Sequence, residues 1–168
     1  MASTDGPTAW FSTFSDRPSK SSADHPGKTA GSVFYAELFP PGVIVPLHSH
    51  EDPEDFYLLA GSQQVLTQQP GGLRWIDAHA GDYVRIPPGT MHAHRNVSSE
   101  PAVDLVITTP KLGRFFEEIG QPVSASPEPP SPEYIERFVA TAIAYGYVLG
   151  TPEQNAAAGI ELPQLTAV

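Results

Sequence analysis

The chain has 168 residues and a formal net charge of −10, and 40% of its residues are hydrophobic. This length suits one domain with a hydrophobic core, and the acidic balance argues against nucleic acid as a partner. The absence of cysteine excludes disulfides and zinc–cysteine sites, so any metal must be bound by histidine, carboxylate or water.

The start of the chain carries no recognisable targeting signal. The first residues, MASTDGPTAW, have neither the basic region nor the apolar region of a signal peptide. No apolar run approaches the roughly 18 to 20 residues of a membrane span. We therefore expect a cytoplasmic protein with no membrane partner.

Residues 1–31 are rich in Ser, Thr, Pro and Gly and are predicted to form a partly flexible N-terminal extension. They contain one aromatic island, Trp10-Phe11 and Phe14. Aromatic residues outside a core more often mark an interface, so the island is expected to pack on the barrel or on a second subunit. The alternative is a lid over a pocket.

From residue 32 to residue 110, short apolar runs alternate with turn signals. Seven or eight strands with turns every 8 to 12 residues indicate an all-β sandwich or small barrel. The expected strands include 32–39, the stretch after Gly42, 63–69, 73–78, 83–87, 91–97 and 102–109.

After Pro110 the pattern becomes helical, and residues 111–168 are expected to form C-terminal helices with a linker and a tail. Residues 112–120 predict a short helix that ends at Gly120. A proline-rich linker follows at 121–131. Residues 133–145 then carry a helical apolar stripe, with Pro132 at the first helical position. From Gly150 onward the sequence carries little signal.

Two histidine pairs dominate the polar residues of the strand region. His48 and His50, and also His92 and His94, are separated by one residue, and residues i and i+2 of a strand share a face. The first pair is followed by an acidic cluster of Glu51, Asp52, Glu54 and Asp55. Imidazoles and a carboxylate that converge make a first-row metal site with open positions.

The spacing of these residues resembles the two cupin motifs. The first motif, G-x5-H-x-H-x3–4-E-x6-G, is matched by Gly42, His48, His50, Glu54 and Gly61. The second motif, G-x5-P-x-G-x2-H-x3-N, is matched by Gly81, Pro87, Gly89, His92 and Asn96. The resemblance covers roughly residues 32–109. It implies a cupin jelly-roll β-barrel that binds one divalent transition metal ion (Fe, Mn, Co, Ni, Cu or Zn) through His48, His50, Glu54 and His92.

The roles of two residues, one within the span of each motif, stay open. Asp55 is the second candidate carboxylate, but it faces the opposite way if the strand has already begun. His94 replaces the large apolar residue that cupins often have two places after the second-motif histidine. It is either an interior histidine with a satisfied hydrogen bond or a catalytic base near the metal with a pKa close to the working pH.

Segments around the motifs also resemble single-domain bacterial quercetin 2,3-dioxygenases. The resemblance implies a metal-dependent dioxygenase acting on a flavonol-like or other enolisable aromatic substrate, with dioxygen as co-substrate and Glu54 as a possible base. His94, which departs from the family pattern, is the second candidate catalytic residue. A non-oxidative cyclase, isomerase or dehydratase would use the same donors. A third alternative is a non-catalytic small-molecule-binding cupin. Most cupins of this size pair, so a homodimer is expected.

Overall fold

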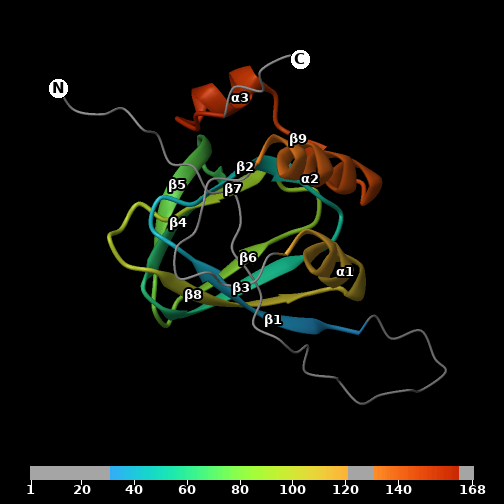
Figure 1. The fold of residues 1–168 in the computed structure, drawn as a ribbon. Helices are drawn as coiled ribbons and strands as arrows, with labels where there is room; N and C mark the ends of the chain where they lie inside the picture. Colours follow the sequence, from blue (N-terminus) through green and yellow to red (C-terminus); the bar gives the residue numbers. More distant parts are fainter. Residues whose placement is uncertain (1–30, 121–130, 163–168) are drawn as a thin grey trace.

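Two antiparallel sheets face each other in the part of the chain that the structure describes, residues 31–120 and 131–162 of a computed structural model (Figure 1). One sheet has the strand order β1-β8-β3-β6 and the other β5-β4-β7-β2-β9. The strands are β1 (Val33–Phe39), β2 (Ile44–Ser49), β3 (Glu54–Ala60), β4 (Ser62–Gln69), β5 (Gly72–His79), β6 (Tyr83–Ile86), β7 (His92–Arg95), β8 (Ala102–Thr108) and β9 (Val148–Leu149).

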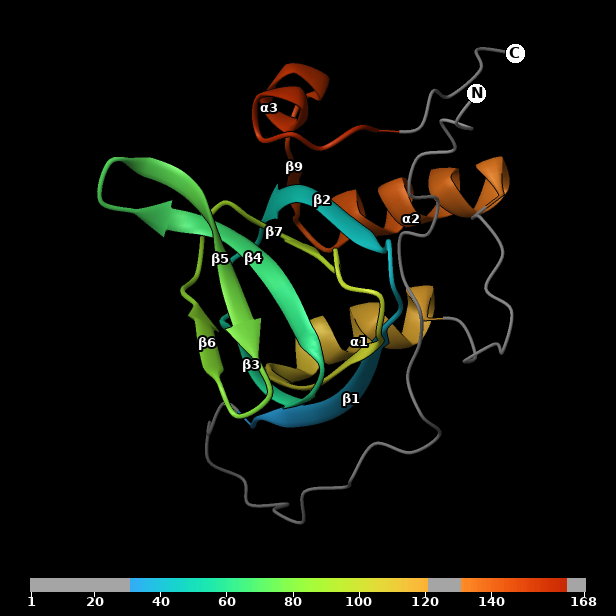
Figure 2. The ribbon, with the colours of Figure 1, turned by 90° about the vertical axis from the view of Figure 1, so that its left-hand side faces the viewer.

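Most neighbours in these sheets are distant in the sequence, as in a jelly roll. Only β4 and β5 are consecutive and paired, whereas β1 pairs with β8, and β2 with both β7 and β9. Figure 2 shows the two sheets on either side of a common interior. The predicted class, an all-β jelly roll with short C-terminal helices, is confirmed. The aromatic island at residues 10–14 and the linker segment 121–130 lie outside the described residues.

The alternation of side chains along the strands determines which of them reach the interior. On β3, Phe56 and Leu58 are buried, whereas Tyr57 and Leu59 are 41% and 50% exposed. On β6, Arg85 lies on the outer face. These positions agree with the period of two expected for a half-buried strand, and they put Glu54, at the start of β3, inside the barrel.

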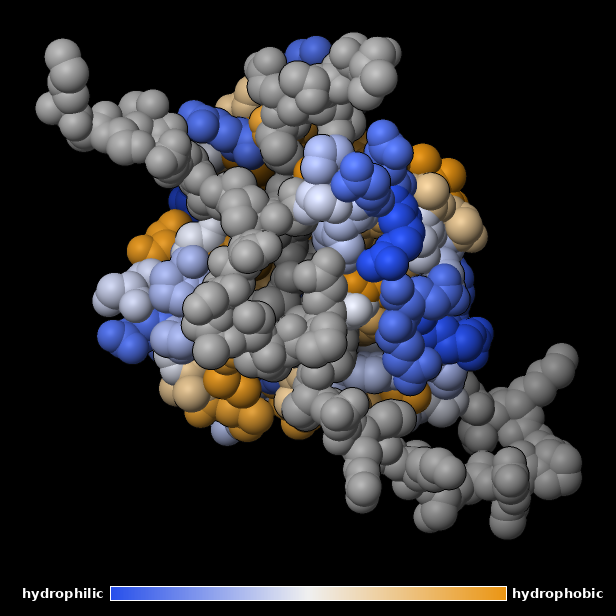
Figure 3. Space-filling view, viewed as in Figure 1, coloured by the Kyte–Doolittle hydropathy of each residue, from blue (hydrophilic) through white to orange (hydrophobic). Residues whose placement is uncertain are grey.

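Two helices cover one side of the barrel (Figure 1). Helix α1 (Pro110–Ile119) begins after the N-cap Thr109, and α2 (Pro132–Ala144) after the N-cap Ser131, each with proline in its first turn. Both helices match the sequence prediction. The outer face of α1 is mostly hydrophilic (Figure 3), while Phe115 of α1 and Phe138 of α2 join the largest core cluster together with residues of the barrel. Burying one such aromatic side chain contributes roughly 1.5–3 kcal/mol.

The end of the described chain is more ordered than its sequence suggested. After β9 comes a third helix, α3 (Pro152–Ala157), with a capping box between Thr151 and Gln154. The buried Asn155 accepts a hydrogen bond from the Leu47 amide of β2, 2.9 Å away, and its own amide donates to the carbonyls of Gly150 and Thr151. These bonds fasten the C-terminal segment to β2.

No helix in the described ranges is long and apolar enough to cross a membrane.

Candidate metal centre

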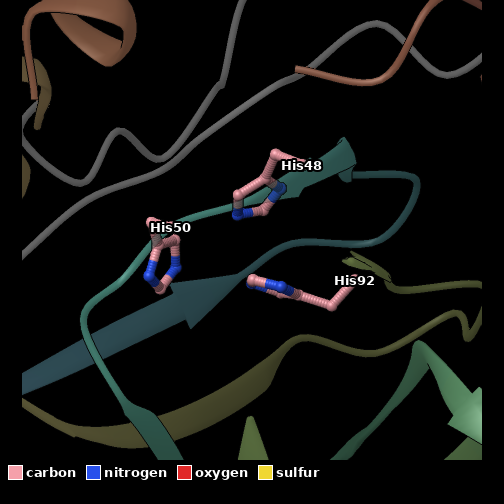
Figure 4. A group of neighbouring side chains, drawn as sticks. All are labelled: His48, His50 and His92. Atoms are coloured by element: carbon pink, nitrogen blue, oxygen red, sulfur yellow. The ribbon is translucent and has the colours of Figure 1, made fainter. Parts of the chain in front are cut away.

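Three buried histidines meet at one end of the barrel interior. His48 lies on β2, His50 directly follows that strand, and His92 is the first residue of β7. His48 and His92 are register partners, with an irregularity in the pairing just before His48. Figure 4 shows the three rings turned toward a common space. One ring nitrogen from each lies within 4.8 Å of the others, a spacing that could hold a metal ion.

The backbone sets the tautomer of each ring. The Nδ1 atoms of His48, His50 and His92 lie 2.7, 2.8 and 2.8 Å from the carbonyl oxygens of Pro46, Asp52 and Thr90, respectively. A carbonyl only accepts, so each Nδ1 carries the proton and donates it. Each Nε2 is then left with a lone pair, which is the form of imidazole that binds a metal.

Glu54 completes the group. Its Oε2 lies 3.5 Å from Nε2 of His50 and 3.4 Å from Nε2 of His92, and these two ring nitrogens are buried without a hydrogen-bond partner. Buried polar atoms are normally satisfied, and unsatisfied ones call for an explanation. A divalent ion between three imidazoles and a carboxylate would satisfy them, so these residues fit a metal.

The carboxylates of Asp52 and Asp55 have partners other than the histidines. Asp52 accepts a hydrogen bond from Thr109 and lies 3.2 Å from Nζ of Lys111. Asp55 lies 3.9 Å from Nε of Arg85, on the opposite side of β3 from Glu54, as the parity prediction requires.

Burial and the neighbouring rings control the charges of the site. Burial, followed by His92 and His50, holds the pKa of His48 well below its ordinary value, so His48 is neutral. Burial alone would raise the pKa of Glu54, but the adjacent His50 and His92 outweigh it and bring this pKa far below its usual range. Glu54 is therefore a carboxylate, the form that ligates a metal.

His94 lies inside the barrel, as predicted, but its environment differs from both alternatives. Its ring is buried 4.5 Å from the ring of Phe56, and neither of its nitrogens has a hydrogen-bond partner. It is therefore not a satisfied interior histidine. Burial, followed by His92, lowers the pKa of His94 to about 3, well away from neutral pH. It also forms a second possible donor group with Glu54 and His92.

Sequence reasoning missed two residues of the site. A small cavity of about 20 Å³ lies beside the donors, and its polar lining includes Glu37 and Tyr147 together with Glu54 and His94. Glu37 could have been found, because it shares the inward parity of Tyr35 and Phe39 on β1. No local pattern marks Tyr147.

The motif glycines and asparagine have structural roles. All four motif glycines have positive φ. Asn96 is buried, and its side-chain amide donates to the carbonyls of Phe39 and Glu100.

Comparison with known proteins gives a match to one protein family and to several solved structures. The family described as a cupin domain matches residues 35–108. The chain is 28% identical to DMSP lyase DddQ from Ruegeria pomeroyi (TM-score 0.43), covering 50% of this chain and 41% of that one. It is 24% identical to a predicted oxalate decarboxylase from Thermotoga maritima (TM-score 0.41), covering 46% and 64%.

A third solved structure, oxalate decarboxylase from Lactobacillus farciminis in a formate complex, is 25% identical (TM-score 0.41), covering 46% of this chain and 23% of that one. The chain thus spans less than two thirds of each of these three proteins. With TM-scores below 0.5, these similarities carry no information about the reaction. No curated protein is significantly similar to the chain.

Proposed function

Residues 35–108 match the cupin domain family, and from that premise we propose that the protein is a metal-dependent enzyme whose substrate presents an anionic oxygen. One observation supports the proposal most directly. The tautomers of three buried histidines are set so that their Nε2 atoms face a common space beside the Glu54 carboxylate, and two of these atoms have no partner.

The donor set also suits such a substrate by its charge. Three neutral imidazoles and one carboxylate around a divalent ion leave a net charge near +1. When bound, the ion would supply Lewis acidity toward a phenolate, enolate or carboxylate oxygen and, if it is redox-active, the means to use dioxygen.

The side chains around the donors serve to position the substrate and transfer protons. Glu54 is ionised and lines the cavity, so it can accept the proton of a substrate hydroxyl. His94 is neutral, with one nitrogen that donates and one that accepts, and both lack a partner. It can therefore orient a polar group of the substrate next to Glu54.

Within this class we propose a dioxygenase acting on a flavonol-like or other enolisable aromatic compound. The proposal draws on the likeness of EDFYLLAG (54–61) and PPGTMHAHRN (87–96) to quercetin 2,3-dioxygenases. The metal-loaded protein should consume dioxygen when flavonols or polyketide-like phenols are added, measured with an oxygen electrode. Turnover that continues under strict anaerobiosis would contradict the dioxygenase.

A non-oxidative lyase, isomerase or cyclase is the second candidate, and one observation favours it. The cavity contains Glu37, a second buried carboxyl group outside the donor set, whose pKa burial raises well above its ordinary value. A protonated acid opposite an ionised Glu54 is the pairing that acid–base chemistry uses. Product formation without oxygen uptake, followed by chromatography, would identify this class.

His94→Phe should lower turnover at least tenfold while leaving the metal content unchanged. Phenylalanine suits the site sterically, because His94 already packs against the rings of Phe56 and Phe39. Elemental analysis and steady-state rates test this. The matched control is His79→Phe, at the exposed last residue of β5, 15 residues earlier. Turnover equal to that of the wild type would remove His94 from the reaction.

A further inference from the structure

Tyr147 lies against the metal donors without belonging to them. It connects α2 to β9, and its ring is stacked on that of His48, with centroids 5.4 Å apart and planes 16° apart. The His50 ring is 4.8 Å away. Tyr147 lines the same small cavity as Glu54 and His94. The side chain is buried. Its hydroxyl takes part in no hydrogen bond between residues of the described ranges, but it is not one of the fully buried atoms that lack a partner.

The backbone holds this ring firmly in place. Tyr147 N–H donates to the Ala142 carbonyl at the end of α2, 2.9 Å away, and Gly146 supplies the positive φ that turns the chain. On the other side, Leu149 of β9 is the register partner of His48. The ring also packs on Phe115, with centroids 4.5 Å apart. A buried aromatic residue fixed on both sides, with an unused hydroxyl, is suited to meeting a ligand.

A phenol hydroxyl is ordinarily protonated at neutral pH. Tyr147 lines the cavity beside Glu54 and His94, so it brings a neutral hydrogen-bond donor next to the metal donors. A neutral donor can stabilise an anion without competing with the metal charge.

We propose that the Tyr147 hydroxyl donates a hydrogen bond to the anionic oxygen of a ligand at the metal centre. This inference rests on the proposed function, since it requires the metal to be bound by the histidines and Glu54. The ligand class is an oxyanion, such as a carboxylate, enolate or phenolate. Tyr147 would then select anionic oxygen ligands over neutral nitrogen ligands.

Anion binding to the cobalt(II)-loaded full chain tests this assignment. Acetate and imidazole are titrated separately, and the visible absorption of cobalt(II) reports binding. In Tyr147→Phe, which keeps the ring stacked on His48, the dissociation constant for acetate should rise about tenfold, the effect of losing a hydrogen bond to a charged group. The constant for imidazole should not change, because metal-bound imidazole has no acceptor left for a hydroxyl.

Tyr145→Phe is the matched control, because Tyr145 bonds to Glu118 outside the cavity. It should leave both constants unchanged. An unchanged acetate constant in Tyr147→Phe would overturn the inference, and so would equal weakening of acetate and imidazole, which indicates a purely structural role. If acetate does not alter the wild-type spectrum, the inference also fails. Cobalt uptake in the same samples would still support the metal centre of the proposed function.

Discussion

Replacing His92 by alanine should leave the purified protein with almost no bound metal. His92 belongs to both possible donor groups, the one with His48 and His50 and the one with Glu54 and His94. No second arrangement of these residues can therefore replace it. Its ring is fully buried, and Nδ1 is already committed to the Thr90 carbonyl. Loss of the residue that hydrogen-bonds to a metal ligand weakens metal binding by up to about 100-fold. Loss of the ligand His92 itself should weaken metal binding by more than that.

Elemental analysis and competition with a chromophoric chelator measure this loss. His79→Ala is the control, because His79 is the exposed last residue of β5 and belongs to neither donor group, and it should retain the wild-type metal content. Added metal should raise the melting temperature of the wild type but not of His92→Ala, since only a bound ligand stabilises the native state. Wild-type metal content in His92→Ala would contradict the donor set.

Gly61→Ala should destabilise the protein by more than about 3 kcal/mol, since the left-handed backbone alone costs an L side chain roughly 1–2 kcal/mol. Gly61 joins β3 to β4 with φ +71°, and a Cβ there would lie 2.3 Å from the carbonyl oxygen of Pro101. That neighbour is backbone at the start of β8 and cannot move aside without disturbing the pairing of β8 with β3.

Gly81→Ala separates the two causes. Gly81 also has positive φ, +95°, but a Cβ there meets nothing within 4 Å. Gly81→Ala should therefore destabilise the protein only by the roughly 1–2 kcal/mol that backbone strain costs. Urea unfolding of both variants and the wild type measures the difference. Equal losses of stability in the two variants would show that the close contact with Pro101 does not matter. Backbone strain alone would then explain why the first motif ends in glycine.

The barrel and its donors were predictable because their signals are local. The period of two along β3 placed Phe56 and Leu58 inside, and proline and glycine marked the turns. The start of α2 followed from Pro132 and its N-cap Ser131, whereas α1 begins at Pro110, two residues before the predicted start at 112, because Thr109 caps it. The motif spacing predicted four donors from three segments of the chain. In the structure, one ring nitrogen from each of the three histidines lies within 4.8 Å of the others, and Oε2 of Glu54 lies 3.5 Å from Nε2 of His50.

The rest of the site depends on contacts between distant residues. Pairing of β9 with β2 joins residues about 100 positions apart, and a two-residue strand has no periodicity to detect. Tyr147 reaches the donors only through that pairing. The capping box at Thr151 was a readable signal for α3, but it could not show that Asn155 would bond to β2. The lack of hydrogen-bond partners for both ring nitrogens of His94 likewise depends on its neighbours in the fold and not on its spacing in the sequence.

The attachment of β9 to β2 has a consequence for the order of events during protein synthesis. His48 to His92 leave the ribosome before Tyr147 and Leu149, which form the wall beside His48. At about 5–20 residues per second, roughly 3 to 11 s separate residue 92 from residue 149. During that interval the nascent barrel can take up a metal from the surrounding pool with this wall still missing. Chains refolded at full length have no such interval, so the metal they acquire can differ from the metal acquired in the cell.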